Sequence, residues 1–391
     1  MSEPLAPAQQ APSGALSFGM VAGEASGDLL AGLLIQGLRQ RWPQAHGFGI
    51  GGPRMAALGF DAWWPHERLA VRGYVEVLRH YRGIVAIREQ LKQRLLASPP
   101  DVFIGVDAPD FNLDLEAQLK AAGIPTVHFV CPSIWAWRPE RIEKIQRSVD
   151  HMLCIFPFEP ELLARSGIEA TYVGHPLAQT IAMTPDRAAA RRALGLDADR
   201  PVVALLPGSR QSEIEHLVPR FIQAAQIMQK KQPSLQFVLP AIPSLLAVVQ
   251  KLVDAQGGLK GLQVLTGQSH QALAACDVTL IASGTATLEA ALFKRPMVIG
   301  YHMNWLSWQI MKRKKLQPWV GLPNILCQDF VVPEFIQDQC TPDALAGATL
   351  DWLDQPDRVD ALQTRFQQLH QTLQRDTADL ATHALEKVLG A

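Results

Sequence analysis

The sequence predicts an α/β protein made of two Rossmann-like, doubly wound domains with a cleft between them. Short apolar or β-branched runs alternate with longer segments of helical periodicity along most of the 391 residues. This alternation is typical of parallel sheets that are covered by helices on both faces. The chain is also too long for one small core, because domains usually contain roughly 100–200 residues.

Strands are expected where the apolar runs are short and rich in β-branched residues. In the first half of the chain these runs are 18–22, 46–50, 102–106, 126–131, 152–156 and 171–173. In the second half they are 202–206, 236–239, 263–266, 278–282 and 297–300. Helical patterns lie between them, for example at 112–122 and 139–147, and everything after Pro342 is predicted to be helical.

The joint between the domains is expected at about 175–200, where proline-containing and polar sequence follows Gly174-His175-Pro176. We expect four segments in all. They are a disordered tail at 1–15, an N-terminal domain at 16–180, a C-terminal domain at 181–345 and terminal helices at 346–391.

Composition narrows the class of protein. Hydrophobic residues make up 48% and charged residues 19% of the chain, which is typical of a folded protein. The formal net charge of −1 gives no overall basic field for nucleic acid. Five scattered cysteines without a C-x-x-C pair argue against a disulfide framework or a zinc site and favour a reducing cytosol. Since no signal peptide or bilayer-spanning run is recognisable, we expect a soluble or surface-bound protein.

The loop Gly23-Glu24-Ala25-Ser26-Gly27-Asp28 directly follows the first predicted strand and opens a helix. Its glycines permit a tight turn, and the helix amino terminus offers N–H groups to an anion or a hydroxyl. Ser26 or Asp28 is expected to cap this helix. A capped turn without any ligand remains the plainer interpretation. The G-x-G-x-x-G match at 47–52 overlaps a predicted strand instead of following one, so we reject a nicotinamide enzyme.

Two carboxylates follow the strand at 102–106, in the segment Gly105–Asn112. Asp107 is expected at the carboxyl end of the strand, facing the cleft, where it can take a proton from an attacking hydroxyl. An Asx-turn is the alternative role for Asp107, and Asp110 is expected to cap the following helix.

Aromatic and histidine side chains mark two further loops of the first domain. The segment Cys131–Arg138 contains two tryptophans, which form either apolar walls of a site or part of the core. His175 is expected at the mouth of the cleft, where a lone histidine more often has a structural than a catalytic role.

Two strand–turn–helix loops are predicted in the second domain, at Pro207-Gly208-Ser209-Arg210 and at Ser283-Gly284-Thr285. Helix amino termini of this kind bind phosphate, and the Arg210 guanidinium can bind a diphosphate through paired hydrogen bonds. Glu289 can accept hydrogen bonds from ribose hydroxyls, or it only complements the helix dipole. Together the two loops indicate a nucleotide diphosphate. No Asp-x-Asp pair follows a strand, so we expect no metal ion to stabilise the leaving group.

Apolar and basic residues are interleaved between Leu69 and Arg88, as in amphipathic segments that lie in a lipid interface. The predicted membrane-contact residues are Val71, Tyr74, Val75 and Leu78. An ordinary partly buried helix is the alternative. A second candidate is Trp305–Lys315, where aromatic residues precede four consecutive basic ones that can instead meet an acidic substrate head group.

The loops taken in order resemble the motif series of the lipid A disaccharide synthases. The matching segments are 23–28, 105–112, 132–138, 174–176, 207–210, 283–289 and Leu322-Pro323-Asn324. The similarity runs from about Gly19 to near the C-terminus. Each motif is short, but the ordered set is specific.

The resemblance implies the B-type glycosyltransferase architecture, with UDP bound by the second domain and the terminal helices packed back on the first. It implies transfer of 2,3-diacylglucosamine from UDP to the 6-hydroxyl of 2,3-diacylglucosamine 1-phosphate, with inversion and without a metal or cofactor. It also implies action at the cytoplasmic face of the inner membrane of Gram-negative bacteria. A homodimer is compatible with the sequence, which does not set the oligomeric state.

The same resemblance assigns roles to individual residues. Asp107 becomes the general base and Glu24 a carboxylate of the substrate site. The residues expected on the UDP side are Gly208, Ser209, Arg210, Ser283, Gly284, Thr285, Glu289 and Asn324.

Two other classes of function remain in competition. One is another UDP-hexosamine enzyme of the same fold, either a UDP-N-acetylglucosamine 2-epimerase or a peptidoglycan-type transferase. The basic amphipathic segment argues against the first, and Glu24 and Asp28 in the first loop argue against the second. The other is a nucleotide-sugar binding module without catalytic activity.

Overall fold

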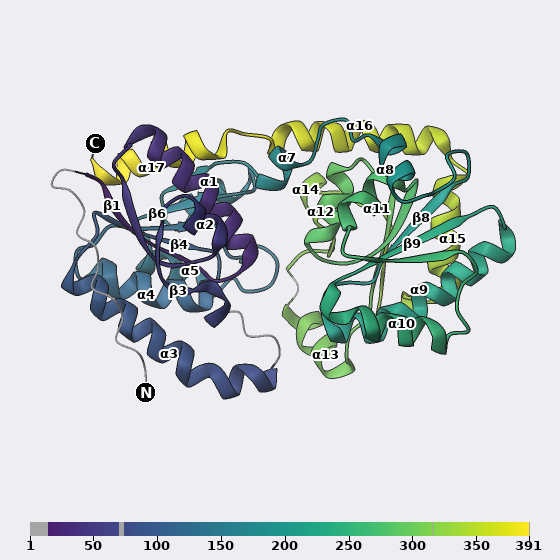
Figure 1. Cartoon of the computed structure of the whole chain (residues 1–391), viewed down its shortest axis with the longest axis horizontal. Coiled ribbons are helices and arrows are strands. Elements are labelled where there is room, and N and C mark those ends of the chain that lie inside the picture. The colour runs from purple at the N-terminus through teal and green to yellow at the C-terminus, as the bar shows by residue number, and fades with distance from the viewer. Residues whose placement is uncertain (1–14, 70–73, 315, 391) are drawn as a thin grey trace. The chain divides into compact units, whose positions relative to one another are not determined.

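Two parallel β-sheets, each with helices packed on both faces, organise the chain (Figure 1). The computed structural model describes residues 15–69, 74–314 and 316–390. Two units form around these sheets. The first comprises the chain up to Pro176 together with the segment from Leu373 onward, and the second comprises Leu177–Thr372.

The first sheet has seven strands in the order β3-β2-β1-β4-β5-β6-β7. They are β1 (Ser17–Ala22), β2 (His46–Gly51), β3 (Asp61–Pro65), β4 (Val102–Val106), β5 (Thr126–Phe129), β6 (His151–Cys154) and β7 (Ala170–Tyr172). In the register of β1, Val21 pairs with Ile50 of β2 on one side and with Gly105 of β4 on the other. The strand order reverses between β1 and β4, and such switch points are where ligands of doubly wound sheets bind.

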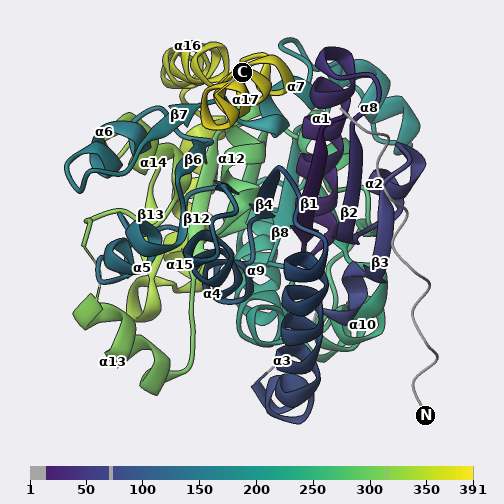
Figure 2. The ribbon, with the colours of Figure 1, turned by 90° about the vertical axis from the view of Figure 1, so that its left-hand side faces the viewer.

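The helices of the first unit pack on the buried, apolar faces of this sheet. They are α1 (Ala25–Arg41), α2 (Pro53–Ala57), the 3-10 helix η1 (His66–Arg68), α3 (Tyr74–Ala97), α4 (Pro109–Ala121), α5 (Arg141–Ser148), α6 (Glu159–Ala164) and α17 (Thr377–Leu389). The helices α3 and α4 lie side by side (Figure 2). The C-terminal helix α17 packs on α1, and the close approach depends on Gly37, where a Cβ atom would lie 2.6 Å from the carbonyl oxygen of Ala378.

The second sheet has six strands in the order β10-β9-β8-β11-β12-β13. They are β8 (Val202–Leu206), β9 (Gln236–Ala241), β10 (Leu262–Thr266), β11 (Val278–Ala282), β12 (Met297–Tyr301) and β13 (Glu334–Ile336). The order reverses between β8 and β11, which places a second switch point there.

The helices of the second unit again cover both faces of its sheet (Figure 1). The first group is α7 (Pro176–Thr180), α8 (Arg187–Ala193), α9 (Gln211–Lys231), the 3-10 helix η2 (Pro243–Leu245), α10 (Leu246–Ala255), α11 (Ser269–Ala275) and α12 (Thr285–Leu292). The second group is α13 (Trp305–Lys314), α14 (Leu322–Cys327), the 3-10 helix η3 (Gln337–Gln339), α15 (Pro342–Leu353) and α16 (Pro356–Leu373).

The predicted fold class is confirmed, and the strands predicted from apolar runs are all present. Those at 102–106, 202–206 and 278–282 have the predicted bounds, and the others differ by one or two residues at one or both ends. The strand predicted at 126–131 ends at Phe129, because Val130 adopts a left-handed φ of +82°. Two strands were missed, β3 and β13. Both lie at sheet edges and are partly exposed, so they lack the continuous apolar run of a central strand.

Two sequence-based expectations concern membranes and the chain start. No helix among the described residues combines the length and the apolar character needed to cross a bilayer. Of the tail predicted at 1–15, only Ala15 belongs to the described residues, so that prediction lies almost wholly outside them.

Candidate active site

The first switch point begins with the loop between β1 and α1. The Asp28 carboxylate is buried and accepts hydrogen bonds from the backbone N–H groups of Gly52 (2.9 Å), Arg54 (3.0 Å) and Met55 (3.1 Å). Asp28 therefore caps α2. The prediction that Ser26 or Asp28 caps α1 was wrong, because α1 begins after Glu24 without a side-chain cap.

The turn after β4 places Asp107 at the same switch point. Asp107 is half-buried, and both Asp107 (φ +52°) and Ala108 (φ +45°) are left-handed. A Cβ atom at Gly23 would lie 3.0 Å from that of Ala108, so the loop carrying Glu24 runs directly beside this turn. Glu24 itself is exposed. The two candidate catalytic carboxylates thus lie on adjacent loops.

Asp110, which was expected to cap α4, has a different role. The helix follows Ala108 without a side-chain cap, and Asp110 Oδ1 accepts from Arg141 Nη2 at 2.5 Å. The capping prediction was wrong, because Asp110 already lies inside the first turn of the helix. It ties α4 to α5 instead.

The two tryptophans of the Cys131–Arg138 loop have separate roles. Trp135 is buried and donates from Nε1 to Glu159 Oε1 at 3.0 Å, while the backbone N–H of Phe156 donates to Glu159 Oε2 at 3.0 Å. Burial raises the pKa of Glu159 to about 7. Trp137 is 40% exposed, and the Arg138 guanidinium lies 4.0 Å from its ring centre. Trp135 thus belongs to the core and Trp137 is available as a wall of a site.

His175 is buried, with its ring 5.6 Å from that of Phe156. Burial lowers the pKa of His175 to about 4. The imidazole is therefore neutral near pH 7, which agrees with the structural role that was favoured for it over acid–base catalysis.

A hollow of about 390 Å³ lies at the switch point of the second sheet. Its walls are Leu206, Gly208, Ser209, Arg210, Glu213, Pro240, Ala241, Ile242, Gly267, Ser269, Ala282, Ser283, Gly284, Thr285, Ala286 and Glu289. Seven of the eight residues expected on the UDP side line this hollow; Asn324 is the exception. The loops after β8 and β11, which are far apart in the sequence, both contribute to its lining.

The loop after β8 is organised by Glu213, a residue the sequence analysis did not select. Its Oε2 accepts from the backbone N–H groups of Ser209 (3.0 Å) and Arg210 (3.2 Å). Gly208 has a φ of +110°, and a Cβ atom there would lie 2.5 Å from Glu213 Oε2. These N–H groups are thus already paired within the chain. The Arg210 side chain is 79% exposed, and its Nη1 pairs with Glu213 Oε1 at 3.3 Å. The sequence signal was the glutamate at the third helical position, whose carboxylate can accept from backbone N–H groups at the start of its own helix.

The loop after β11 is more open. Helix α12 begins after Gly284, which has a φ of +146°, and nothing lies within 4 Å of the position where its Cβ atom would be. Ser283 Oγ donates to the carbonyl oxygen of Val320 at 2.9 Å. Glu289 Oε2 lies 3.6 Å from His270 Nε2, and the hydrogen bond with Glu289 raises the pKa of His270. His270 was not selected from the sequence, because its partner follows nineteen positions later in another helix.

Asn324 is fully buried behind this loop. Its Nδ2 donates to the carbonyl oxygen of Val332 (2.9 Å) and to Glu334 Oε1 (2.8 Å). The Glu334 carboxylate also accepts from the backbone N–H of Val320, and the Val320 carbonyl oxygen accepts from the Ser283 hydroxyl. Asn324 is therefore connected to the hollow through Glu334 and Val320, without lining it.

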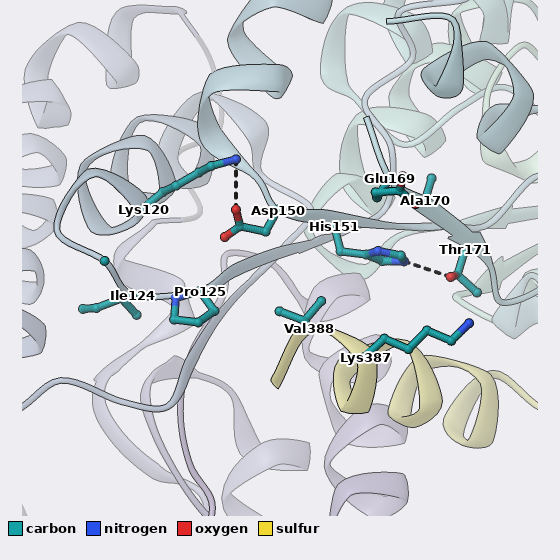
Figure 3. A pocket seen from close by; sticks show the side chains of 11 residues that line it. Lys120, Ile124, Pro125, Asp150, His151, Glu169, Ala170, Thr171, Lys387 and Val388 are labelled. Atoms are coloured by element: carbon teal, nitrogen blue, oxygen red, sulfur yellow. Dashed lines mark hydrogen bonds and ion pairs between the residues drawn. The ribbon is translucent and has the colours of Figure 1, made fainter. Parts of the chain in front are cut away.

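Another hollow, of about 720 Å³, lies at the opposite end of the first sheet, where β5, β6 and β7 begin (Figure 3). Lys120 Nζ pairs with Asp150 Oδ1 at 3.1 Å, and His151 Nε2 lies 2.8 Å from Thr171 Oγ1. Ligands of doubly wound sheets bind at the carboxyl ends of the strands. We therefore do not assign the active site to this hollow.

The remaining predicted residues concern membrane contact. Val71 lies outside the described residues, and Tyr74, Val75 and Leu78 lie on α3, of which the structure describes the backbone at these positions. In the described parts of the chain, no group of three or more His, Cys, Asp or Glu side chains is placed to hold a metal ion.

Two units with this strand order place the chain in the fold class shared by B-type glycosyltransferases and UDP-sugar epimerases. A UDP-N-acetylglucosamine 2-epimerase from Neisseria meningitidis, solved with UDP-GlcNAc, superposes with a TM-score of 0.64 at 10% identity, covering 96% of this chain and 100% of that one. The calicheamicin glycosyltransferase CalG4 gives a TM-score of 0.58 at 16% identity, covering 96% and 98%. At these identities the likeness establishes the fold alone.

Sequence similarity then identifies the family. The family described as lipid-A-disaccharide synthetase matches residues 19–388. Proteins named lipid-A-disaccharide synthase are 66% identical in Albidiferax ferrireducens, covering 96% of this chain and 97% of the relative, and 60% identical in Verminephrobacter eiseniae, covering 98% and 99%. One from Burkholderia pseudomallei is 54% identical, covering 96% and 97%. The chain belongs to the lipid-A-disaccharide synthetase family, which confirms the resemblance seen in its motifs.

Proposed function

We propose that the protein is an inverting, metal-independent glycosyltransferase that makes the lipid A disaccharide. It transfers 2,3-diacylglucosamine from UDP to the 6-hydroxyl of 2,3-diacylglucosamine 1-phosphate, giving the β-1,6-linked disaccharide 1-phosphate and UDP. The observation that carries the proposal is the full-length similarity to relatives named for this activity, combined with a switch-point hollow lined by seven of the eight predicted UDP residues.

In the proposed reaction Asp107 is the general base. Its carboxylate takes the proton of the acceptor's 6-hydroxyl while that oxygen attacks the anomeric carbon from the face opposite UDP. The bond from the anomeric carbon to the diphosphate oxygen breaks, and UDP leaves with the electron pair. Glu24, on the adjacent loop, contributes to the substrate site. Inversion follows from this single displacement.

We place the diphosphate of UDP at the start of α12 rather than at the loop after β8. Glu213 already occupies the N–H groups of Ser209 and Arg210, so that loop offers the Arg210 side chain. The open amino terminus at Gly284 and Thr285 supplies N–H donors to the phosphate oxygens. Glu289 accepts hydrogen bonds from the ribose hydroxyls. Asn324 stabilises the part of the lining that contains Ser283 without contacting UDP.

We further propose that the protein acts at the cytoplasmic face of the inner membrane, with the segment 69–88 in contact with lipid. The support is its interleaved basic and apolar sequence, together with the lipid character of the proposed substrates. A homodimer is the assembly we would test first, by light scattering of the purified protein.

The deciding experiment supplies purified protein with both acylated sugars and follows disaccharide and UDP by mass spectrometry. UDP should appear only when donor and acceptor are both present. Conversion of UDP-N-acetylglucosamine without an acceptor would favour the epimerase, and tight UDP binding without any product would favour a binding module. Asp107→Asn should retain UDP affinity and lose most turnover; a variant with full turnover would exclude Asp107 as the base.

A further inference from the structure

The backbone turn that carries Asp107 is held in an unfavourable conformation. Asp107 (φ +52°) and Ala108 (φ +45°) are consecutive left-handed residues, and neither is glycine. A Cβ atom makes this region costly for L residues. Such conformations persist only where the surrounding contacts impose them, and they are concentrated at functional sites.

The turn is held by the backbone N–H of Asp107, which donates to the carbonyl oxygen of Phe129 at 2.8 Å, and by the side chain of Asn112. Its side-chain amide donates to the carbonyl oxygen of Asp107 at 2.8 Å, and its Nδ2 also lies 3.4 Å from the carbonyl of Val106 and 3.5 Å from that of Val21. One amide nitrogen thus faces the end of β4, the turn itself and the end of β1. The loop that carries Glu24 begins two residues after Val21.

Packing alone does not account for Asn112. The residue is fully buried inside α4, and its Oδ1 has no hydrogen-bond partner among the described residues. A buried, unpaired amide oxygen is unfavourable, and an apolar side chain of similar size would avoid that cost. The functional part of the Asn112 side chain is therefore its NH₂ group, which donates to the turn.

Helix α4 packs closely against β4, and this close packing brings Asn112 within hydrogen-bond distance of the turn. A Cβ atom at Gly105 would lie 2.9 Å from the Cβ of Asn112 and 2.0 Å from Glu116 Oε1, so the helix approaches β4 this closely only because residue 105 is glycine. One turn after Asn112, Glu116 Oε1 lies 2.7 Å from His128 Nδ1, and both side chains are fully buried. This pair joins α4 to β5 beneath the turn.

We infer that Asn112 is a positioning residue for the transfer reaction: its amide holds the Asp107–Ala108 turn left-handed and so directs the Asp107 carboxylate. Asn112 acts through Asp107 and touches no substrate. The inference rests on the proposed role of Asp107 as general base.

A double-mutant cycle tests this inference, using the full chain, both acylated sugars and a radiolabelled donor. Asn112→Ala should lower kcat by roughly 10- to 100-fold, with KM for both sugars and the affinity for UDP within about twofold of wild type. In the Asp107→Asn background the same substitution should change kcat by less than about twofold, because the group that it positions is already lost. Equal losses in both backgrounds would overturn the inference.

One control variant separates positioning from general destabilisation. Ser148 lies in α5, and its buried hydroxyl donates at 2.8 Å to the carbonyl oxygen of Leu113 in α4, the helix that carries Asn112. Ser148→Ala removes this contact with α4 without touching the Asp107–Ala108 turn. It should lower the melting temperature while leaving kcat unchanged; a loss of kcat matching that of Asn112→Ala would refute a positioning role. If Asn112→Ala does not fold, Asn112→Ser and Asn112→Asp take its place in the cycle. The cycle also includes the single variant Asp107→Asn. Full turnover by that variant would refute the proposed role of Asp107 as general base, separately from the inference about Asn112.

Discussion

The buried carboxyl group of Glu159 should make the protein less stable as the pH rises from about 4.5 to about 7. Burial raises its pKa from the ordinary 4.5 to about 7. The folded protein therefore binds this proton more tightly than the unfolded chain does. The contribution to stability is fully present below the unfolded pKa and is lost as the pH rises through the folded one.

The size of this effect follows from the shift in pKa. A change from 4.5 to about 7 is 2.5 units. At about 1.4 kcal/mol per unit, ionisation of Glu159 costs the folded state roughly 3 kcal/mol. The side chain is fully buried, so solvent screening does not reduce this figure.

His175 has the opposite dependence. Burial lowers its pKa from 6.5 to about 4, so its contribution to stability is present above pH 6.5 and is lost as the pH falls towards 4. The two effects nearly cancel in the wild-type protein between about pH 4.5 and 6.5. A substitution is needed to reveal either one.

The assay is urea denaturation of wild type and Glu159→Gln between pH 4.5 and 8, followed by tryptophan fluorescence. The difference in the free energy of unfolding should shift by roughly 3 kcal/mol in favour of the variant between pH 4.5 and 8, most of it below pH 7. Glu161→Gln is the matched control, because Glu161 lies on the same helix with its side chain 79% exposed. Parallel curves for Glu159→Gln and wild type would refute the reasoning.

Three other variants, the last a double one, test the site, the fold and the membrane contact. Arg210→Gln should weaken UDP binding roughly tenfold in calorimetry, because the exposed guanidinium is the group its loop offers to a diphosphate. Gly105→Ala should lower the free energy of unfolding by more than about 2 kcal/mol, because its Cβ atom would lie 2.0 Å from Glu116 Oε1. Reversing the charges of Arg72 and Arg79 together should reduce sedimentation with anionic vesicles, since basic residues near such a surface each contribute about 1 kcal/mol.

Each of these predictions has a clear contrary outcome. UDP affinity unchanged by Arg210→Gln would place the diphosphate elsewhere. Gly83→Ala is the control for the glycine substitution, because nothing lies within 4 Å of its Cβ position in α3, and it should be neutral or stabilising. If Gly105→Ala and Gly83→Ala lowered the free energy of unfolding equally, the steric explanation for Gly105 would be wrong. Equal vesicle binding after charge reversal would favour an ordinary helix at 69–88.

Much of the fold was predictable because its signals are local. Apolar runs located the central strands, and glycine turns after them located the loops at both switch points. The two missed strands, β3 and β13, are held mainly by pairing with β2 and β12, and such pairing leaves little trace in a short, partly exposed segment. The ordered motifs identified the family because they keep their sequence spacing whatever packs around them.

The roles of single side chains were less predictable, since they depend on neighbours far along the chain. Asp28 caps a helix that starts 25 positions later, and Asn324 is connected to the hollow through Glu334 and Val320. Nothing local in the sequence marks the raised pKa of Glu159, which comes from what covers it.

The sequence by itself thus determined the fold class, the order of the functional loops and the residues expected in them, because hydrophobic periodicity and turn chemistry act over a few residues. Only the tertiary structure decided which polar groups are buried, which are already paired and which remain free for a ligand. Burial and hydrogen bonding are set by whatever packs against a side chain in space. For Asn112 that meant a donor aimed at the turn of Asp107, which no pattern along the chain records.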